Sequence, residues 1–313
     1  MYNPFMKLVI QIPAYNEEAN IGAVLEDIQK TYDLIDELNI VVLDDCSNDN
    51  TAKIASNYNA KIISFNKRQG LSNVFKFGVQ YALSVGADIL VNIDGDNQYC
   101  AYDIEKLIKP IISNEADIII GSRPINTNSN FSFVKKLFQK FGSIITSFVS
   151  RIKVKDAASG FRALNRDAML NINIFNPFTY TIEMLIQAYI KNLTVKNVDI
   201  RVNKQKKRNS KLFKNDFDYI FKQAKNLIRF FIIYRPARFF SIFGSLFLLI
   251  GGLIGIRFLI YETGHIQSLI LCAIILTLSF ICFLLAILGD LLSINRKLLE
   301  EIRYEIRAEK YKK

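Results

Sequence analysis

The 313-residue chain is poor in the residues that mark several special classes of protein: it has 6 Pro, 14 Gly, 4 Cys and a single His. So few prolines and glycines exclude a collagen-like or low-complexity chain. Four cysteines are too few for a disulfide scaffold, and free cysteines fit a cytoplasmic domain. The lone histidine, His265, lies in a short polar segment and is interpreted as a loop residue, not a metal ligand. Met1 leads directly into a strand-like segment, so we expect no N-terminal signal peptide.

The glycine motifs of two large nucleotide-binding classes are also missing. Neither G-x-G-x-x-G nor G-x-x-x-x-G-K-[S/T] occurs in the sequence. The first motif binds the pyrophosphate of a dinucleotide, and the second binds the phosphates of a nucleoside triphosphate. Their absence argues against a dinucleotide-dependent enzyme and against a P-loop nucleoside triphosphatase.

Hydrophobic residues make up 50% of the chain, which excludes disorder as the main state. Two long apolar runs lie near the C-terminus: residues 241–260 carry one charge, Arg257, and residues 268–289 carry none. A helix of about 20 residues is roughly 30 Å long, which matches the hydrocarbon thickness of a bilayer. We therefore predict a transmembrane helical hairpin. The alternative, a buried helix pair in a soluble core, is disfavoured because charge-free runs of this length are rare there.

The net charge of +11 is concentrated in one segment. Residues 1–200 are nearly neutral, with 20 basic and 21 acidic residues, whereas residues 201–240 hold 12 basic and 2 acidic ones. This distribution argues against a general nucleic-acid-binding surface. Both flanks of the apolar hairpin are basic, and its linker has no Lys or Arg. The positive-inside rule then places both termini and the N-terminal domain in the cytoplasm.

The first 200 residues alternate between strand-like and helix-like segments, which predicts an α/β domain with a mainly parallel sheet covered on both faces. In such sheets, ligands bind beyond the carboxyl ends of the strands. Polar clusters follow four of the expected strands at that edge. The expected strands are 7–12, 39–45, 61–66, 88–94 and 117–122, and the polar clusters are 13–18, 44–49, 94–98 and 121–123.

The most distinctive cluster reads Asp-Gly-Asp-Asn-Gln at residues 94–98. Asp94 and Asp96 place two carboxylates directly after a buried strand, and Gln98 adds a neutral oxygen. Oxygen ligands of this kind suit Mg²⁺ or Mn²⁺, which also keep coordination places for phosphate oxygens. Gly95 allows the turn to approach a ligand closely. The pattern predicts a divalent-metal site at these residues, with an ordinary turn as the alternative.

Taken together, the motifs resemble family 2 glycosyltransferases of the GT-A fold, and more narrowly the polyisoprenyl-phosphate glycosyltransferases. That group includes dolichol-phosphate mannose synthases and bacterial undecaprenyl-phosphate glucosyltransferases. The resemblance implies a GT-A domain followed by juxtamembrane amphipathic helices and two transmembrane helices. One departure is Asn209, which stands where the family often has glycine. The matching segments are 13–18, 44–51, 66–79, 94–98, 156–169, 178–185 and 208–213.

The resemblance also implies how the donor nucleotide is bound. Asp44 and Asp45 would accept hydrogen bonds from the base and the ribose. The alternative for both is a capping role at the helix that begins near Thr51, and for Asp49 that capping role is preferred. The nucleotide-binding residues implied by the resemblance are Pro13, Ala14, Tyr15, Glu17, Asp44, Asp45 and Asp94.

A second group of residues would bind metal and phosphate. Asp94, Asp96 and Gln98 would hold a cation that bridges the diphosphate of a nucleotide sugar. Arg123 follows a predicted strand and would bind a phosphate, with a surface ion pair as the alternative. The resemblance places Arg123, Arg208, Ser210 and Lys211 at the phosphates of donor and acceptor.

The kind of acceptor decides whether a general base is needed. A lipid monophosphate is already ionised near pH 7, so it needs no strong base, whereas a sugar hydroxyl does. Glu183 and Asp156 are the candidates for such a base. We assign Glu183 a positioning role in the catalytic group with Asp94, Asp96 and Arg208, the alternative being an ordinary helix carboxylate.

Two segments combine basic and aromatic residues at helical spacing, namely 131–150 and 212–235. Helices of this kind lie in the headgroup region of a membrane. Core packing is the alternative for the first segment. The sequence thus predicts a catalytic domain at residues 1–211, a juxtamembrane helix at 212–236, a transmembrane hairpin at 237–292 and a charged tail at 293–313.

The predicted activity is an inverting, metal-dependent transfer of one sugar from a UDP- or GDP-sugar to undecaprenyl or dolichyl phosphate. It takes place at the cytoplasmic face of the bilayer, without nucleic acid. Small residues such as Gly251, Gly252 and Gly255 would allow a homo-oligomer through the transmembrane helices. The alternatives are a hydroxyl acceptor on a glycolipid or polysaccharide, and a non-catalytic membrane scaffold. The sugar, the nucleotide and the choice between Mg²⁺ and Mn²⁺ stay open.

Overall fold

The structure is a computed structural model that describes residues 5–28, 32, 35–124, 152, 154–176, 180–203, 225, 228–261 and 266–312. The chain forms two compact units. One unit comprises residues 1–216 together with the last ten residues, 304–313, and the other comprises residues 217–303.

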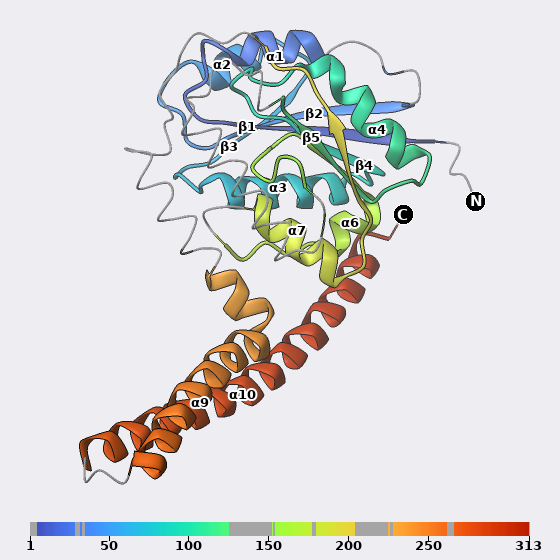
Figure 1. The fold of residues 1–313 in the computed structure, drawn as a ribbon. Helices are drawn as coiled ribbons and strands as arrows, with labels where there is room; N and C mark the ends of the chain where they lie inside the picture. The colour runs from blue at the N-terminus through green and yellow to red at the C-terminus, as the bar shows by residue number, and fades with distance from the viewer. Residues whose placement is uncertain are drawn as a thin grey trace. The chain divides into compact units, whose positions relative to one another are not determined.

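The first unit is built on a seven-stranded sheet with the order β3-β2-β1-β4-β6-β5-β7 (Figure 1). All neighbouring strands are parallel except β6, which is antiparallel to both β4 and β5. The mainly parallel sheet predicted from the sequence is confirmed, whereas β6 and β7 were not anticipated. The strands are β1 (Lys7–Ala14), β2 (Glu37–Asp44), β3 (Lys61–Ser64), β4 (Ile89–Asn92), β5 (Ile118–Ser122), β6 (Arg162–Asn165) and β7 (Val195–Asp199).

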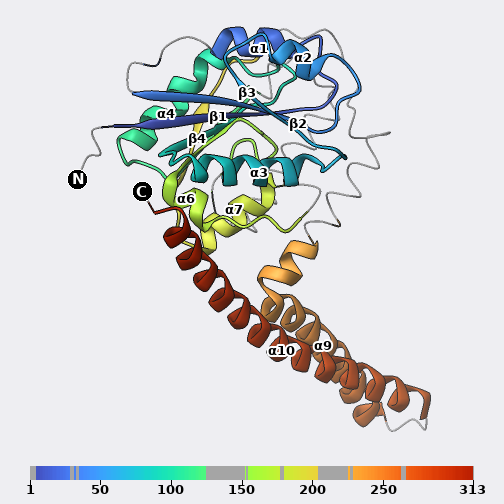
Figure 2. The ribbon, with the colours of Figure 1, turned by 180° about the vertical axis from the view of Figure 1, so that it is seen from behind.

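Helices cover both faces of this sheet (Figures 1 and 2). Successive residues of a strand point to opposite faces, so Ile10 packs in one core cluster and Val9 in the other. Because both faces are buried, the central strands are apolar almost throughout, as in other parallel sheets. One face carries α1 (Ile21–Ile28), α2 (Thr51–Ala55), the 3-10 turn η1 (Ala101–Asp103) and α4 (Ile104–Ile112), and the other carries α3 (Leu71–Ser84), α6 (Arg166–Asn171) and α7 (Thr181–Ile190).

The antiparallel strand β6 determines what lies beside the end of β4. Arg162, the first residue of β6, pairs with Asn92, the last residue of β4. Since the two strands run in opposite directions, the segment that leads into β6 lies next to the segment that leaves β4. Residues 156–161 are therefore brought to the Asp94–Gln98 cluster.

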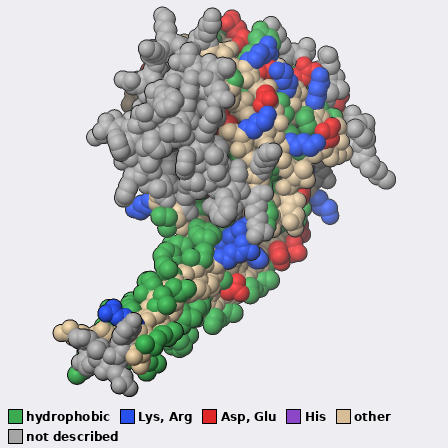
Figure 3. Space-filling view, viewed as in Figure 1, with side chains coloured by type: hydrophobic (Ala, Val, Ile, Leu, Met, Phe, Trp, Pro, Cys, Tyr) green, Lys and Arg blue, Asp and Glu red, His purple; other side chains and the backbone are tan. Residues whose placement is uncertain are grey.

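The second unit contains two long apolar helices, α9 (Pro236–Tyr261) and most of α10 (Ile266–Lys310). Only 11% of the most apolar stretch of α9, and 17% of that of α10, is buried. Hydrophobic side chains predominate on the visible face of the helical part (Figure 3). A core helix of a soluble protein would bury this surface, so the two helices are candidate membrane spans.

Small residues of α9 are used inside the hairpin itself. A Cβ on Gly251 would lie 2.9 Å from Leu276 of α10, and one on Gly255 would lie 3.3 Å from the Sγ of Cys272. Ser279 also donates a hydrogen bond to the Gly244 carbonyl, at 2.8 Å. Gly251 and Gly255, which the sequence suggested for association between chains, therefore pack within this chain. A Cβ on Gly252 would have no described atom within 4 Å.

The last residues of the chain pack on the first unit. Helix α10 continues through the predicted charged tail to Lys310. Tyr304 and Tyr311 pack against the core cluster of the α3, α6 and α7 face. The Tyr304 hydroxyl donates to the Asp167 carboxylate at 2.9 Å. Residues 304–313 are therefore part of the first unit.

Candidate active site

The two carboxylates of the Asp94–Gln98 cluster follow β4, in the middle of the sheet. The Oδ1 atom of Asp94 is buried and has no hydrogen-bond partner among the described residues. Burial, and then the neighbouring Asp96 carboxylate, raise the pKa of Asp94, although Arg123 acts in the opposite direction. A buried carboxylate oxygen without a donor, beside a second carboxylate, is costly unless a cation is bound there. The donor set thus fits Mg²⁺ or Mn²⁺.

The backbone of Gly160 closes one side of Asp94. A Cβ on Gly160 would lie 2.7 and 2.8 Å from the two carboxylate oxygens of Asp94. Hydrogen bonds fix the peptide groups of Gly160: its N–H donates to the Tyr99 hydroxyl at 3.0 Å, and its carbonyl accepts from Asn92 at 2.8 Å. Only glycine allows the loop to approach the carboxylate this closely.

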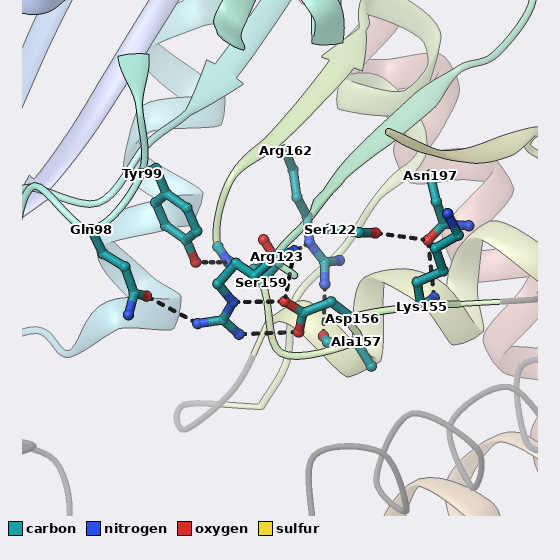
Figure 4. A network of polar contacts seen from close by, with 11 residues as sticks. Gln98, Tyr99, Ser122, Arg123, Lys155, Asp156, Ala157, Ser159, Arg162 and Asn197 are labelled. Atoms are coloured by element: carbon teal, nitrogen blue, oxygen red, sulfur yellow. Dashed lines mark hydrogen bonds and ion pairs between the residues drawn. The ribbon is translucent and has the colours of Figure 1, made fainter. Parts of the chain in front are cut away.

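Arg123 connects the end of β5 to two other parts of the site (Figure 4). Its Nε and Nη2 donate to the two oxygens of Asp156 at 2.6 and 3.0 Å, and its Nη1 donates to Gln98 Oε1 at 3.0 Å. The side chains of Arg123 and Asp156 are 7% and 1% exposed. The pair is therefore a buried ion pair, not the surface pair considered as an alternative. The phosphate-binding role of Arg123 stays a prediction.

Two hydrogen bonds, one to its side chain and one from its backbone, fix the orientation of Gln98. Its side-chain oxygen accepts the hydrogen bond from Arg123, and its backbone N–H donates to Asp96 Oδ1 at 3.0 Å. Among the described residues, no group of three or more His, Cys, Asp and Glu side chains is arranged to hold a metal ion. A cation at Asp94 and Asp96 would therefore complete its coordination with diphosphate oxygens or water.

The residues predicted to bind the nucleotide lie at the neighbouring strand ends. Ala14 pairs with Asp44, so β1 and β2 end side by side. The Asp44 carboxylate accepts from the backbone N–H of Ser47 at 3.2 Å. The Tyr15 ring, at the end of β1, is covered by the Arg68 guanidinium at 3.7 Å. The structure thus brings this part of the predicted pocket together.

Asp45 has a backbone role that the sequence did not reveal. Its carboxylate accepts from the N–H groups of Gln69 and Gly70, just before α3 begins. Gly70 has a φ of 81°, a conformation that favours glycine. Asp45 thus holds the turn before α3, and neither it nor Asp44 caps α2. Asp49 accepts from the Thr51 N–H at 3.0 Å, but the N-cap residue of α2 is Asn50, not Asp49 as predicted.

Glu17 and Glu183 are both engaged with parts of the protein. The Glu17 carboxylate accepts from the Asn20 side chain at 2.9 Å. Glu183, in the first turn of α7, is 2% exposed. Its carboxylate accepts from the backbone N–H groups of Phe175 and Asn176 at 3.0 and 2.9 Å. Glu183 therefore positions the segment before α7, and its predicted link to the acceptor stays a prediction.

Several predicted site residues lie outside the described residues. These are Arg208, Ser210 and Lys211, together with the amphipathic segment 131–150 and most of 212–235. Their predicted contacts with phosphate and with lipid remain predictions.

A buried polar network under the site was not recognised from the sequence. Gln11 of β1 donates to Asn92 at 2.8 Å, and Asn92 donates to the Tyr180 hydroxyl at 3.1 Å. A Cβ on Gly78 would lie 1.6 Å from Gln11 Oε1, so α3 needs glycine there. The sequence feature that could have revealed this network is Gln11, a polar residue inside an otherwise apolar strand. The sequence also did not reveal a role for Arg162, which lies in the matching segment 156–169.

The sheet, its two helical layers and the carboxylate pair beyond β4 define a glycosyltransferase of the GT-A class. The fold is similar to that of glucosyl-3-phosphoglycerate synthase from Mycobacterium tuberculosis in complex with Mn²⁺, UDP and glucosyl-3-phosphoglycerate. The TM-score is 0.56 at 18% identity, covering 72% of this chain and 79% of that one. Residues 9–172, more than half of the chain, match the model of glycosyl transferase family 2. The chain belongs to this family and is a glycosyltransferase.

Curated relatives support the narrower resemblance. The chain is 35% identical over 178 residues to UDP-N-acetylglucosamine–dolichyl-phosphate N-acetylglucosaminyltransferase of Methanococcus voltae, covering 50% of this chain and 69% of that one. It is 33% identical over 204 residues to dolichol-phosphate mannosyltransferase of Pyrococcus furiosus, covering 62% and 55%. The similarity to polyisoprenyl-phosphate glycosyltransferases is thus confirmed.

Proposed function

We propose that this enzyme transfers one sugar from a UDP- or GDP-sugar to a polyisoprenyl phosphate, with inversion and with a divalent cation. The observation that carries the proposal is the buried Oδ1 of Asp94, which has no hydrogen-bond partner in the described part of the chain and lies beside Asp96. This arrangement is suited to a cation and a diphosphate, which a nucleotide sugar brings. The relatives named as dolichyl-phosphate transferases support the choice of acceptor.

The chain's own residues would prepare the site for the leaving group. Asp94, Asp96 and Gln98 would hold the cation, and Arg123 fixes the amide of Gln98. When bound, the cation would neutralise the charge that develops on the departing nucleoside diphosphate. The nucleotide would lie along the ends of β1 and β2, near Tyr15 and Asp44.

The surroundings of the two candidate general bases favour a phosphate acceptor over a hydroxyl acceptor. Asp156 is 1% exposed and binds Arg123, and Glu183 is 2% exposed and binds two backbone N–H groups. A phosphate acceptor already carries its negative charge, so it needs neither as a base. Its oxygen would form a bond to the anomeric carbon opposite the diphosphate as the carbon–diphosphate bond breaks, which inverts the configuration.

The acceptor's long lipid chain requires a membrane. The exposed apolar surfaces of α9 and α10, and the basic segment 201–240, support an enzyme anchored at the cytoplasmic face. Arg208, Ser210 and Lys211 would then provide positive charge and a hydroxyl close to the acceptor phosphate.

The test uses the full chain in membranes or detergent with labelled UDP- and GDP-sugars and undecaprenyl or dolichyl phosphate. We expect an acid-labile glycolipid whose formation stops in EDTA and resumes with Mn²⁺ or Mg²⁺. Asp96→Asn should abolish transfer, whereas Glu105→Gln, an exposed carboxylate on α4, serves as the matched control. Full activity in EDTA would refute the cation, and an acid-stable product would indicate a hydroxyl acceptor. Absence of both transfer and Mn²⁺-dependent nucleotide binding would indicate a scaffold.

A further inference from the structure

Arg162 is among the largest fully buried side chains in the described part of the chain. Its guanidinium donates to three backbone carbonyls, those of Ala157 at 2.8 Å, Ser159 at 2.9 Å and Thr181 at 2.8 Å. Figure 4 shows Arg162 beside Ala157 and Ser159. Among the described residues, no carboxylate forms an ion pair with it. A guanidinium keeps its charge in proteins, so Arg162 is a buried cation bound only by neutral groups.

Burial of such a charge is unfavourable and needs compensation. Burial lowers the pKa of Arg162, whereas Tyr180, and after it Asp156, Tyr99 and Asp94, act in the opposite direction. Asp156 and Asp94 belong to the candidate active site. Part of the compensation for Arg162 therefore comes from residues around the predicted cation.

Two of the three carbonyls that Arg162 binds, those of Ala157 and Ser159, belong to the loop 156–160, which lines one side of the candidate site. At one end of this loop, Asp156 binds Arg123, which in turn orients Gln98. At the other end, Gly160 closes one side of Asp94. Arg162 holds the loop between these two ends. Its third acceptor lies in the first turn of α7, so it also ties the loop to that helix.

We propose that Arg162 is a positioning residue for the cation site, which it does not touch. It holds the loop 156–160 so that Gly160 stays against Asp94 and Asp156 stays on Arg123. The proposal rests on the proposed cation role of Asp94 and Asp96. Lysine cannot substitute, because a single ammonium lacks the planar fork that reaches three carbonyls at once.

The experiment measures Mn²⁺ binding to the purified full chain by the electron paramagnetic resonance of free Mn²⁺, without substrate. We expect Arg162→Lys to raise the Mn²⁺ dissociation constant roughly 10-fold, as outer-sphere changes do. The Mn²⁺ concentration for half-maximal transfer should rise in parallel, with a smaller change at saturating Mn²⁺. The matched control is Arg166→Lys, since Arg166 also binds backbone carbonyls, those of Ala87 and Tyr311. Arg166→Lys should leave the Mn²⁺ dissociation constant within about twofold of the wild-type value.

Circular dichroism and thermal melting establish that each variant is folded. A folded Arg162→Lys with wild-type Mn²⁺ affinity would overturn the proposal, as would an equal shift in Arg166→Lys.

If Arg162→Lys does not fold, Gly160→Ala decides, because its Cβ would press the same loop against Asp94. A weaker affinity in that variant supports the proposal, and an unchanged one overturns it. If the wild type binds no Mn²⁺, the cation role fails too, whereas wild-type binding with unaffected variants refutes the role of Arg162 alone.

Discussion

Arg123 and Asp156 form a two-point ion pair, with nitrogen–oxygen distances of 2.6 and 3.0 Å, in which both side chains are buried. The two residues are 33 positions apart in the sequence. The pair joins the end of β5 to the loop before β6, and through Gln98 it reaches the predicted cation site. Its removal should therefore affect both stability and the site.

Asp156→Ala leaves the Arg123 charge buried without its counterion. Breaking a buried pair in this way costs about 3–5 kcal/mol, so we expect a clear fall in the free energy of unfolding and in transfer. The matched control is Asp199→Ala, which removes an exposed pair with Lys155 whose side chains are 61% and 75% exposed. That change should cost less than about 1 kcal/mol. Thermal and urea unfolding compare the two, and equal losses would contradict the buried role.

Gly78→Ala should destabilise the catalytic unit because the new Cβ would lie 1.6 Å from Gln11 Oε1. Overpacking of this kind typically costs about 1–3 kcal/mol. Gln80→Ala, at an exposed position on the same helix, should stay within about 0.5 kcal/mol of the wild type. Urea unfolding measures both. A Gly78→Ala variant as stable as Gln80→Ala would show that Gln11 moves aside without cost.

The C-terminal turns of α10 should contribute to the stability of the catalytic unit. Arg307 donates to the carbonyls of Leu170 and Ile172, at 3.0 and 3.3 Å. Hydrogen bonds from a charged donor contribute about 1.5–3 kcal/mol, so Arg307→Ala should lower the melting temperature and the amide protection of residues 166–173. Arg303→Ala, on an exposed position of the same helix, is the control. Hydrogen exchange tests this directly, and unchanged protection in Arg307→Ala would argue that the contact is not stabilising.

Asp103 should make stability depend on pH in the acid range. Burial alone would raise the pKa of Asp103, but hydrogen bonds from Arg201 and Lys106 outweigh it and hold this pKa below its ordinary value. The folded state therefore favours the ionised form. The stabilisation is complete above the unfolded pKa of about 4 and is lost as the pH falls through the lower, folded pKa. We expect the stability difference between wild type and Asp103→Asn to shrink in that window. Urea unfolding as a function of pH measures it, and a constant difference would refute the role of Asp103.

Most of the sheet and the central carboxylates could be predicted from the sequence because their signals are local. Apolar strands, amphipathic helices and the Asp94–Gln98 cluster each depend on residues that are neighbours in the chain. The strand β6 was missed because its residues, Arg-Ala-Leu-Asn, begin and end with polar side chains and do not form an apolar run like that of β4. The roles of Asp45 and Glu183 were not visible because their partners are backbone N–H groups, which leave no pattern in the sequence.

The sequence by itself determined the α/β class, the family motifs, the two apolar helices and the position of the basic segment. These properties follow from the order of polar, apolar and charged residues. Only the tertiary structure decided that Gly160 closes one side of Asp94, that Arg123 binds Asp156, and that Gly251 packs within its own hairpin. Such pairings depend on which distant segments the antiparallel β6 and the packed helices bring together. Steric fit and the need to satisfy buried charges then select the contacts among those segments.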